Sequence, residues 1–289
     1  MLRPVLAPGL RVLRRSRTEL QVGLRPEVCV PDTEPVRRTL DHLVRGEAVP
    51  GDAETRAVLD ALAPVLVDGT GLLTPGFAVG DVAAVAAQDH SGYRDRLAAR
   101  RSARVAVQGI VPDLDPTRLL DAVGLPVTDR PDGGPTAVLV LSLGEIDRVE
   151  LDALVRTGTP HLLVRLVEGA VLVGPFVVPG RTACLRCSDA HRLVDDPSAT
   201  TLVARHAAAR AARQDGVAEP VDTALGTLAL AWAVRDLVTH VEGGRPSTWS
   251  STVRIEPALA ALTQTEWLRH PACGCGWSSD AHPSRTMVG

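Results

Sequence analysis

Two cysteines end the stretch Val177-Val178-Pro179-Gly180-Arg181-Thr182-Ala183-Cys184-Leu185-Arg186-Cys187. A second pair, separated by one residue, lies in the stretch His270-Pro271-Ala272-Cys273-Gly274-Cys275-Gly276-Trp277. Two short clusters that each supply two thiolates fill the four corners of a tetrahedral zinc site. The sequence therefore predicts a structural Zn²⁺ bound by Cys184, Cys187, Cys273 and Cys275.

The alternatives to zinc are buried free thiols and a redox-active C-x-x-C motif. A redox motif has no need of the second pair. Gly274 and Gly276 give the loop around Cys275 the backbone freedom that two ligands from one short loop require. The fifth cysteine, Cys29, has no other cysteine near it in the sequence, which argues against a disulfide framework.

The composition excludes several kinds of chemistry. The sequence contains no lysine and no asparagine, so all 31 of its basic Lys+Arg residues are arginines. This excludes a lysine Schiff base and the phosphate-binding lysine of Walker-type nucleotide sites. The arginines are scattered among 34 acidic residues and the net charge is -3, so we expect no nucleic-acid partner.

No membrane or secretion signal is visible in the sequence. The chain has 289 residues, of which 45% are apolar, but its apolar stretches are too short or too charged to span a bilayer. Its first residues, Met1-Leu2-Arg3-Pro4, do not lead into the apolar run of a signal peptide. We therefore expect a globular cytoplasmic protein without a membrane segment.

Residues 1–75 predict a small winged-helix-like α+β module. Apolar alternation and helical periodicity predict strands over 10–15, 19–24 and 28–30, helices over 34–45 and 52–64, and a wing hairpin over 66–73. The strands would form an antiparallel meander. An N-terminal subdomain that merely packs on the rest of the chain is the alternative. Residues 76–101 would link this module onward, with a helix over 82–100.

Residues 102–289 predict a second domain in which strands and helices alternate. The expected strands are 104–108, 126–128, 136–141, 161–166, 170–177, 252–255 and 259–263, and the expected helices are 116–123, 145–157, 200–213 and 223–240. This alternation is typical of an α/β fold with a mostly parallel sheet.

The segment from about residue 104 to 277 resembles the ThiF/MoeB group of ubiquitin-activating-type adenylyltransferases. The resemblance rests on the Pro-Gly-x-Thr-x-Cys-x-x-Cys segment at 179–187, on Glu242-Gly243-Gly244-Arg245-Pro246, and on the second cysteine pair. Together with the N-terminal module, the chain looks most like actinobacterial cyclodehydratase-associated proteins. These proteins belong to the biosynthesis of thiazole/oxazole-modified microcins and thiopeptides, which are ribosomally synthesised and post-translationally modified peptides (RiPPs).

The resemblance implies what each part would do. The winged-helix module would be a RiPP recognition element that binds the leader segment of a precursor peptide. The ThiF-like body would be a degenerate Rossmann-like scaffold, commonly a homodimer in relatives, for a YcaO-type partner that performs the ATP-dependent cyclodehydration.

The expected nucleotide site departs from the adenylating pattern. A glycine-rich turn after the first strand normally meets the phosphates with its backbone N–H groups. Here Gly109 keeps the first glycine position, but Val111 and Leu114 occupy the other two and Pro112 lacks an N–H. Asp129 stands at the spacing expected of a ribose partner. We therefore expect a degenerate site at Gly109 and Asp129 that does not bind ATP.

Leader binding would use the edge of the N-terminal sheet. An extended peptide would add as a strand beside the third strand, and a helix would form the other wall of the groove. The candidate contacts are Val28, Cys29, Val30, Arg56, Leu59 and Leu62. Ordinary core packing is the alternative for each of them.

Three functions remain open from the sequence. The favoured one is a non-catalytic leader peptide-binding scaffold that presents the precursor to its partner. The alternative is an active adenylyltransferase acting on a carrier protein or peptide C-terminus, with Arg118 or Arg130 in place of the lysine. A thiol redox protein using Cys184 and Cys187 is the third.

Overall fold

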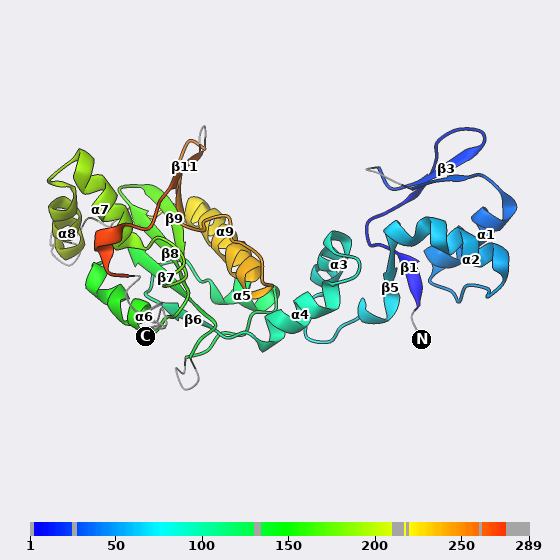
Figure 1. Cartoon of the computed structure of the whole chain (residues 1–289), viewed down its shortest axis with the longest axis horizontal. Coiled ribbons are helices and arrows are strands. Elements are labelled where there is room, and N and C mark those ends of the chain that lie inside the picture. The colour runs from blue at the N-terminus through cyan, green and yellow to red at the C-terminus, as the bar shows by residue number, and fades with distance from the viewer. Residues whose placement is uncertain are drawn as a thin grey trace, which may run out of the picture. The chain divides into compact units, whose positions relative to one another are not determined.

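The chain divides into two units in the computed structural model, which describes residues 3–24, 28–129, 134–209, 217, 220–259 and 262–275. Unit 1 consists of Met1–Arg101 with Ala122–Gly124, and unit 2 of Ser102–Asp121 with Leu125–Gly289. Each unit has its own sheets and helices, many of which are labelled in Figure 1. None of the described helices combines the length and apolar character needed to cross a bilayer.

Unit 1 contains two small antiparallel sheets and four α-helices among its described residues. The strands are β1 (Pro4–Leu6), β2 (Val12–Arg14), β3 (Glu19–Val22), β4 (Val28–Pro31) and β5 (Leu66–Asp68). The helices are α1 (Glu34–Arg45), α2 (Ala53–Leu62), α3 (Val79–Gln88) and α4 (Tyr93–Ser102), with 3-10 turns η1 (Ala63–Val65) and η2 (Gly69–Gly71). The predicted meander is confirmed, since β2, β3 and β4 pair antiparallel in that order.

Helix α1 matches its predicted bounds, and α2 starts where predicted but ends at Leu62, where the 3-10 turn η1 replaces its expected last residues. Helix α1 ends at Gly46, whose φ of 65° is the left-handed conformation that glycine adopts without strain. Helix α2 begins after Asp52, whose side chain accepts a hydrogen bond from the Thr55 N–H. Their apolar faces pack on the meander in one core that includes Val30, Leu40 and Leu62.

Two expectations for unit 1 were wrong. The predicted wing hairpin over 66–73 does not form, because β5 pairs with β1 instead and η2 follows directly. The Asp68 side chain accepts from the Thr70 N–H and so caps η2. The predicted helix over 82–100 is two helices, α3 and α4, and the Asp89 carboxylate accepts from the Gly92 N–H between them.

Unit 2 is built around a six-stranded sheet in the order β11-β10-β9-β8-β7-β6. Its strands are β6 (Val105–Gln108), β7 (Ala137–Leu143), β8 (His161–Val167), β9 (Ala170–Val177), β10 (Ser251–Ile255) and β11 (Leu262–Glu266). Its helices are α5 (Thr117–Ala122), α6 (Asp152–Arg156), α7 (Leu185–Asp195), α8 (Ala199–Ala209) and α9 (Thr223–Val241), with 3-10 turns η3 (Arg148–Leu151) and η4 (Pro271–Cys273).

The expectation of a mostly parallel sheet was wrong, because the sheet is mixed. Only β6, β7 and β8 run parallel, and β8/β9, β9/β10 and β10/β11 are antiparallel. A parallel connection needs a crossover of a dozen or more residues, whereas only Glu168 and Gly169 join β8 to β9. Both residues have positive φ, as a tight hairpin turn requires.

Four further elements of unit 2 differ from expectation. The helix predicted over 145–157 is the 3-10 turn η3 followed by the short α6. Residues 126–128 form no full strand, since Val127 makes only an isolated bridge to Val105. The last strand lies at 262–266 rather than 259–263. Helix α7, which carries one of the cysteine pairs, was not expected at all.

Helices cover both faces of this sheet. Helix α9 packs along β8 and β9 on one face (Figure 1). On the other face, Val138 and Leu163 from the central strands pack in one core with Leu151, Leu185 and the buried cysteines. The cysteine site therefore rests directly on the hydrophobic layer of unit 2.

Candidate functional site

The first cysteine pair is positioned by the start of a helix. Cys184 is the residue before α7 and Cys187 lies in its first turn, where the Cys187 N–H donates to the Cys184 carbonyl at 3.0 Å. Residues three apart at a helix start face the same side. Cys184 is 5% exposed and Cys187 is fully buried.

The second pair is positioned by a tight loop. The 3-10 turn η4 ends at Cys273, and Gly274 follows with a φ of 73°, in the left-handed region. This reversal brings Cys275 back beside Cys273, so that both side chains reach the first pair. Of the two glycines expected to give this loop its backbone freedom, Gly274 does so. Gly276 lies outside the described residues.

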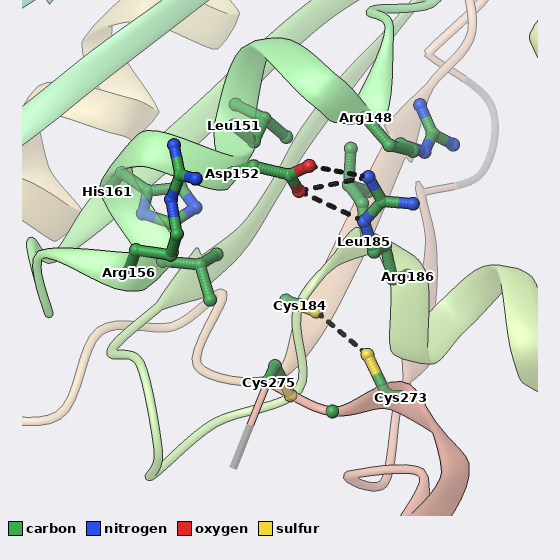
Figure 2. Close-up of a pocket in the computed structure, with 12 residues that line it drawn as sticks. Arg148, Leu151, Asp152, Arg156, His161, Cys184, Leu185, Arg186, Cys273 and Cys275 are labelled. Carbon is green, nitrogen blue, oxygen red and sulfur yellow. Dashed lines mark hydrogen bonds and ion pairs between the residues drawn. The ribbon is translucent and has the colours of Figure 1, made fainter. Parts of the chain in front are cut away.

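The four sulfur atoms have the spacing of a metal site. The Sγ–Sγ distances are 3.8 Å for Cys184–Cys187, 3.5 Å for Cys184–Cys273 and 3.5 Å for Cys187–Cys275, and all four sulfurs lie within 4.8 Å of one another. Zinc–sulfur bonds of about 2.3 Å in a tetrahedron require sulfur separations of about 3.8 Å. Figure 2 shows three of these cysteines converging from α7 and the second loop. The predicted cluster is confirmed, and it could hold a metal ion.

The electrostatics of the cluster also suit a cation. Hydrogen bonds from the other three sulfurs, led by Cys184, lower the pKa of Cys187. The hydrogen bond that Cys184 donates to Cys187 raises the pKa of Cys184. A divalent ion is the positive charge that would hold all four sulfurs as thiolates.

The loop that carries the second pair is anchored on α7. The His191 Nε2 contacts the Leu268 carbonyl at 2.9 Å, and the His191 and His270 rings meet edge to face at 5.0 Å. Arg192 lies over the Trp267 ring at 5.1 Å, and the Trp267 Nε1 donates to the Thr252 hydroxyl. These contacts hold the segment that leads to Cys273 and Cys275 against α7 and β10.

A buried ion network lies beside the cluster, and sequence reasoning missed it. Glu145 accepts from Arg165 at 2.7 Å and from Arg148 at 2.9 Å. Arg148 also makes a two-bond pair with Asp189 of α7, at 2.7 and 2.9 Å. Burial would raise the pKa of Glu145, but the charges of Arg165 and Arg148 lower it to about 2. All four charges are therefore compensated inside the fold.

A cavity of about 250 Å³ opens next to the cysteines. Figure 2 shows Arg186 bound to both carboxylate oxygens of Asp152 at its rim, with distances of 2.9 and 3.0 Å. His161 lines the cavity, and its Nδ1 donates to the Thr159 carbonyl. Burial lowers the pKa of His161, so its ring is neutral.

The degenerate nucleotide turn is shaped by packing. Gly109 has a φ of 85°, and a Cβ there would overlap the Leu141 carbonyl oxygen of β7. Val111 and Leu114 are buried and bridge to each other. The Asp115 carboxylate accepts from the Thr117 N–H at 2.9 Å at the start of α5. Hydrogen bonds from Thr117 lower the pKa of Asp115, so a negative charge stands at this helix start.

The other residues that the sequence suggested for the nucleotide site are exposed or lie outside the described residues. Asp129 and Arg118 are exposed. Arg130, the other arginine considered for a phosphate, lies outside the described residues.

The candidate leader-binding residues lie on β4 and α2 in unit 1. Cys29 and Arg56 are exposed, and Val28 and Leu59 are half-buried at the margin of the same core. Val30 and Leu62 are buried, with 4% and 0% exposure. The first four side chains are thus at least partly accessible, whereas Val30 and Leu62 lie in the core.

Comparison with known proteins places this fold. No protein-family model matches the sequence, and no curated protein does. The structure is similar to that of the heterocyclase TruD, with a TM-score of 0.70 and 18% identity over 96% of this chain and 43% of that one. A heterocyclase in complex with substrate and cofactor has a TM-score of 0.67 and 17% identity, over 95% of this chain and 40% of that one.

E. coli MccB with ATP is similar over nearly its whole length. Its TM-score is 0.56 with 10% identity, over 94% of this chain and 99% of that one. The predicted ThiF-like fold is confirmed by these likenesses. This chain spans about two fifths of the length of the two heterocyclases.

Proposed function

We propose that this protein is a non-catalytic leader peptide-binding scaffold in RiPP biosynthesis. It would bind the leader of a precursor peptide and present the core to a YcaO-type cyclodehydratase. The partner would use ATP to activate the peptide amide, and a cysteine, serine or threonine side chain would then cyclise with loss of water. The fold that this chain shares with heterocyclases supports this pathway class.

The open edge of β4 carries the proposal. Among the described residues, β4 is the last strand of its sheet and pairs only with β3. An exposed edge next to an apolar groove is the structure to which extended peptides add. The half-buried side chains of Val28 and Leu59 would form the two walls, and the exposed Arg56 guanidinium would attract acidic leader residues.

Three features argue against adenylation by this chain. The sequence has no lysine to hold a phosphate. Gly109, at the expected phosphate turn, has a packing role, because a Cβ there would overlap the backbone of β7. The Asp115 carboxylate stands at the start of α5, where its negative charge would repel a phosphate. The protein would therefore act through effective concentration, with the chemistry left to its partner.

In this proposal the four cysteines hold a structural Zn²⁺. Four thiolates leave no open coordination position, so the ion would join α7 to the loop after β11 and would activate neither water nor substrate. A redox role predicts that Cys184 and Cys187 react with a maleimide in the metal-replete protein. Structural zinc predicts protection until a chelator removes the ion.

Leader binding is the decisive measurement. The probe is a fluorescein-labelled synthetic leader from a short Cys/Ser/Thr-rich precursor encoded beside this protein and a YcaO-type protein. Fluorescence anisotropy should give a Kd in the micromolar range or tighter, about -8 kcal/mol. The absence of binding, or of such neighbouring genes, would refute the proposal.

An active adenylyltransferase is the second candidate, because the fold extends over nearly all of a protein crystallised with ATP. It requires arginine to replace lysine at the phosphates. ATP–pyrophosphate exchange distinguishes the two functions: exchange by the purified protein with peptide or carrier substrate would establish the enzyme, and the scaffold predicts none.

A further inference from the structure

The backbone of β4 presents its groups to two sides in strict alternation. The Asp32 N–H donates to the Thr18 carbonyl at 2.8 Å, so the backbone of Asp32 faces β3. Because successive residues of a strand alternate, Val30 and Val28 also face β3, whereas Cys29 and Pro31 face the open edge.

Pro31 limits the hydrogen bonds that the open edge of β4 can make with an added strand. Pro31 has no N–H, and its carbonyl already accepts from the Thr33 N–H at 2.9 Å. Cys29 is the other residue of β4 that faces outward, and its N–H and carbonyl have no hydrogen-bond partner within the described part of the chain. Within Val28–Pro31, Cys29 is therefore the one residue whose N–H and carbonyl could both pair with an added peptide strand.

The side chains around Cys29 define two faces for the added strand. Val28 and Val30 lie on the core side of the sheet, toward Leu59 of α2. The Cys29 side chain lies on the opposite, outer face, where Arg15 contacts its sulfur at 3.4 Å and Gln21 at 2.7 Å. A peptide with an apolar side chain toward α2 and an acidic one toward Arg15 is complementary to both faces.

We infer that the leader peptide, if it binds as proposed above, is held in one register whose backbone ladder ends at Cys29. Proline would act as a stop, so that the residues of the precursor beyond it leave the sheet instead of continuing along β4. This inference rests on the proposed function and adds to it the point at which the leader is fixed and released.

Proline substitutions test the register. Cys29→Pro removes the outward N–H of β4 without breaking a hydrogen bond to β3, since proline is tolerated where an edge N–H faces solvent. Val12→Pro is the matched control, because the backbone N–H of Val12 faces outward from β2, the other edge strand of the sheet. The backbone groups of Arg11 and Arg15 bond to β3, so by alternation those of Val12 do not. Melting curves and circular dichroism verify that both variants are folded.

The expected result is a five- to tenfold rise in the leader Kd for Cys29→Pro and a change below twofold for Val12→Pro. The loss of leader affinity in Cys29→Pro must exceed the loss in Cys29→Ser, which keeps the backbone N–H. Unchanged binding by Cys29→Pro, or a larger loss in Val12→Pro, would overturn the register. A wild-type protein that does not bind the leader would refute the proposed function instead, so the two failures are distinguishable.

N-methylation of the leader, one residue at a time, gives the same answer on the unaltered protein. N-methyl groups should weaken binding at the leader position opposite Cys29 and have little effect at positions that would lie opposite Pro31 or beyond it. A loss at a position opposite or beyond Pro31 would mean that the ladder passes Pro31, and the proposal would be wrong.

Discussion

Among single residues, Arg165 shows how far unit 2 depends on charge compensation. Its side chain is 1% exposed on the central strand β8, and its guanidinium is neutralised by Glu145, which Arg148 also contacts. A buried charge that loses its partner is far more costly than an exposed one. Glu145 is thus expected to contribute to the stability of unit 2.

Replacing Glu145 should therefore destabilise the protein in a pH-dependent way. Glu145→Gln should lower the free energy of unfolding at pH 7 by about 3 kcal/mol, because Arg165 stays buried without its counter-charge. The pKa of Glu145 is lowered from 4.5 to about 2. Its contribution, about 3 kcal/mol, is therefore complete above pH 4.5 and lost as the pH falls through 2.

Urea unfolding at a series of pH values checks this prediction. The difference between wild type and Glu145→Gln should shrink between pH 4.5 and 2, and Glu266→Gln, at an exposed position of β11, should follow wild type throughout. A difference between the two proteins that stays constant over this range would contradict the assignment.

The cysteine cluster gives a second prediction for a single residue. Cys187→Ser removes a fully buried sulfur, so the protein should lose the proposed structural zinc and its melting temperature should fall by about 10 °C. Metal content by mass spectrometry and a thermal melt measure both effects. Cys29→Ser, remote in sequence from the cluster, should keep one zinc per chain; full zinc content in Cys187→Ser would contradict the tetrathiolate site.

Individual helices and strands could be predicted where their signals are local. The bounds of α1 and α2 follow from Gly46 and Asp52, and the two cysteine pairs are visible as short motifs. The partners of β5 and the ion network are not visible, because Arg148 and Asp189 are 41 residues apart and β5 pairs with β1 across most of unit 1. Patterns within one segment cannot specify such distant contacts.

Helix α7 illustrates the same limit. Its polar and apolar residues give little helical periodicity, and its start is defined by Cys184, which is not one of the usual capping residues. The mixed sheet was missed for another reason. The two-residue connection at Glu168-Gly169 already excludes a parallel crossover, but the strands alone suggested a Rossmann order.

The junction of β6 and β7 gives a prediction at the scale of these elements. Gly109→Ala should lower the free energy of unfolding by about 2 kcal/mol, because a Cβ would overlap the Leu141 carbonyl at a positive φ. Gly134→Ala is the control, since Gly134 also has a positive φ but open space around it. Equal losses of unfolding free energy in the two variants, measured by urea unfolding, would mean that the contact with β7 does not require a glycine at position 109.

For the whole molecule, the proposed function separates recognition, at the open edge of β4 in unit 1, from chemistry, which it leaves to a partner. The four cysteines of unit 2 would hold a structural ion. The chain is similar in fold both to a protein crystallised with ATP and to parts of larger heterocyclases, so the fold by itself leaves the catalyst undecided. The altered turn at Gly109 and the charge at Asp115 favour a division of labour. A scaffold of this kind should change how substrate is recruited and leave the reaction step to its partner.

Removing the leader from the substrate should therefore raise KM and leave kcat nearly unchanged. With the YcaO-type partner, ATP and this protein, heterocycle formation on a leaderless core should lose about 10²-fold in kcat/KM, because binding is no longer intramolecular. Mass spectrometry follows the loss of one water per ring, and free leader added to the full-length precursor should inhibit by competition. A leaderless core that is processed with unchanged KM, or a loss confined to kcat, would mean that this chain contributes to the reaction step, and the division between recognition and catalysis would be wrong.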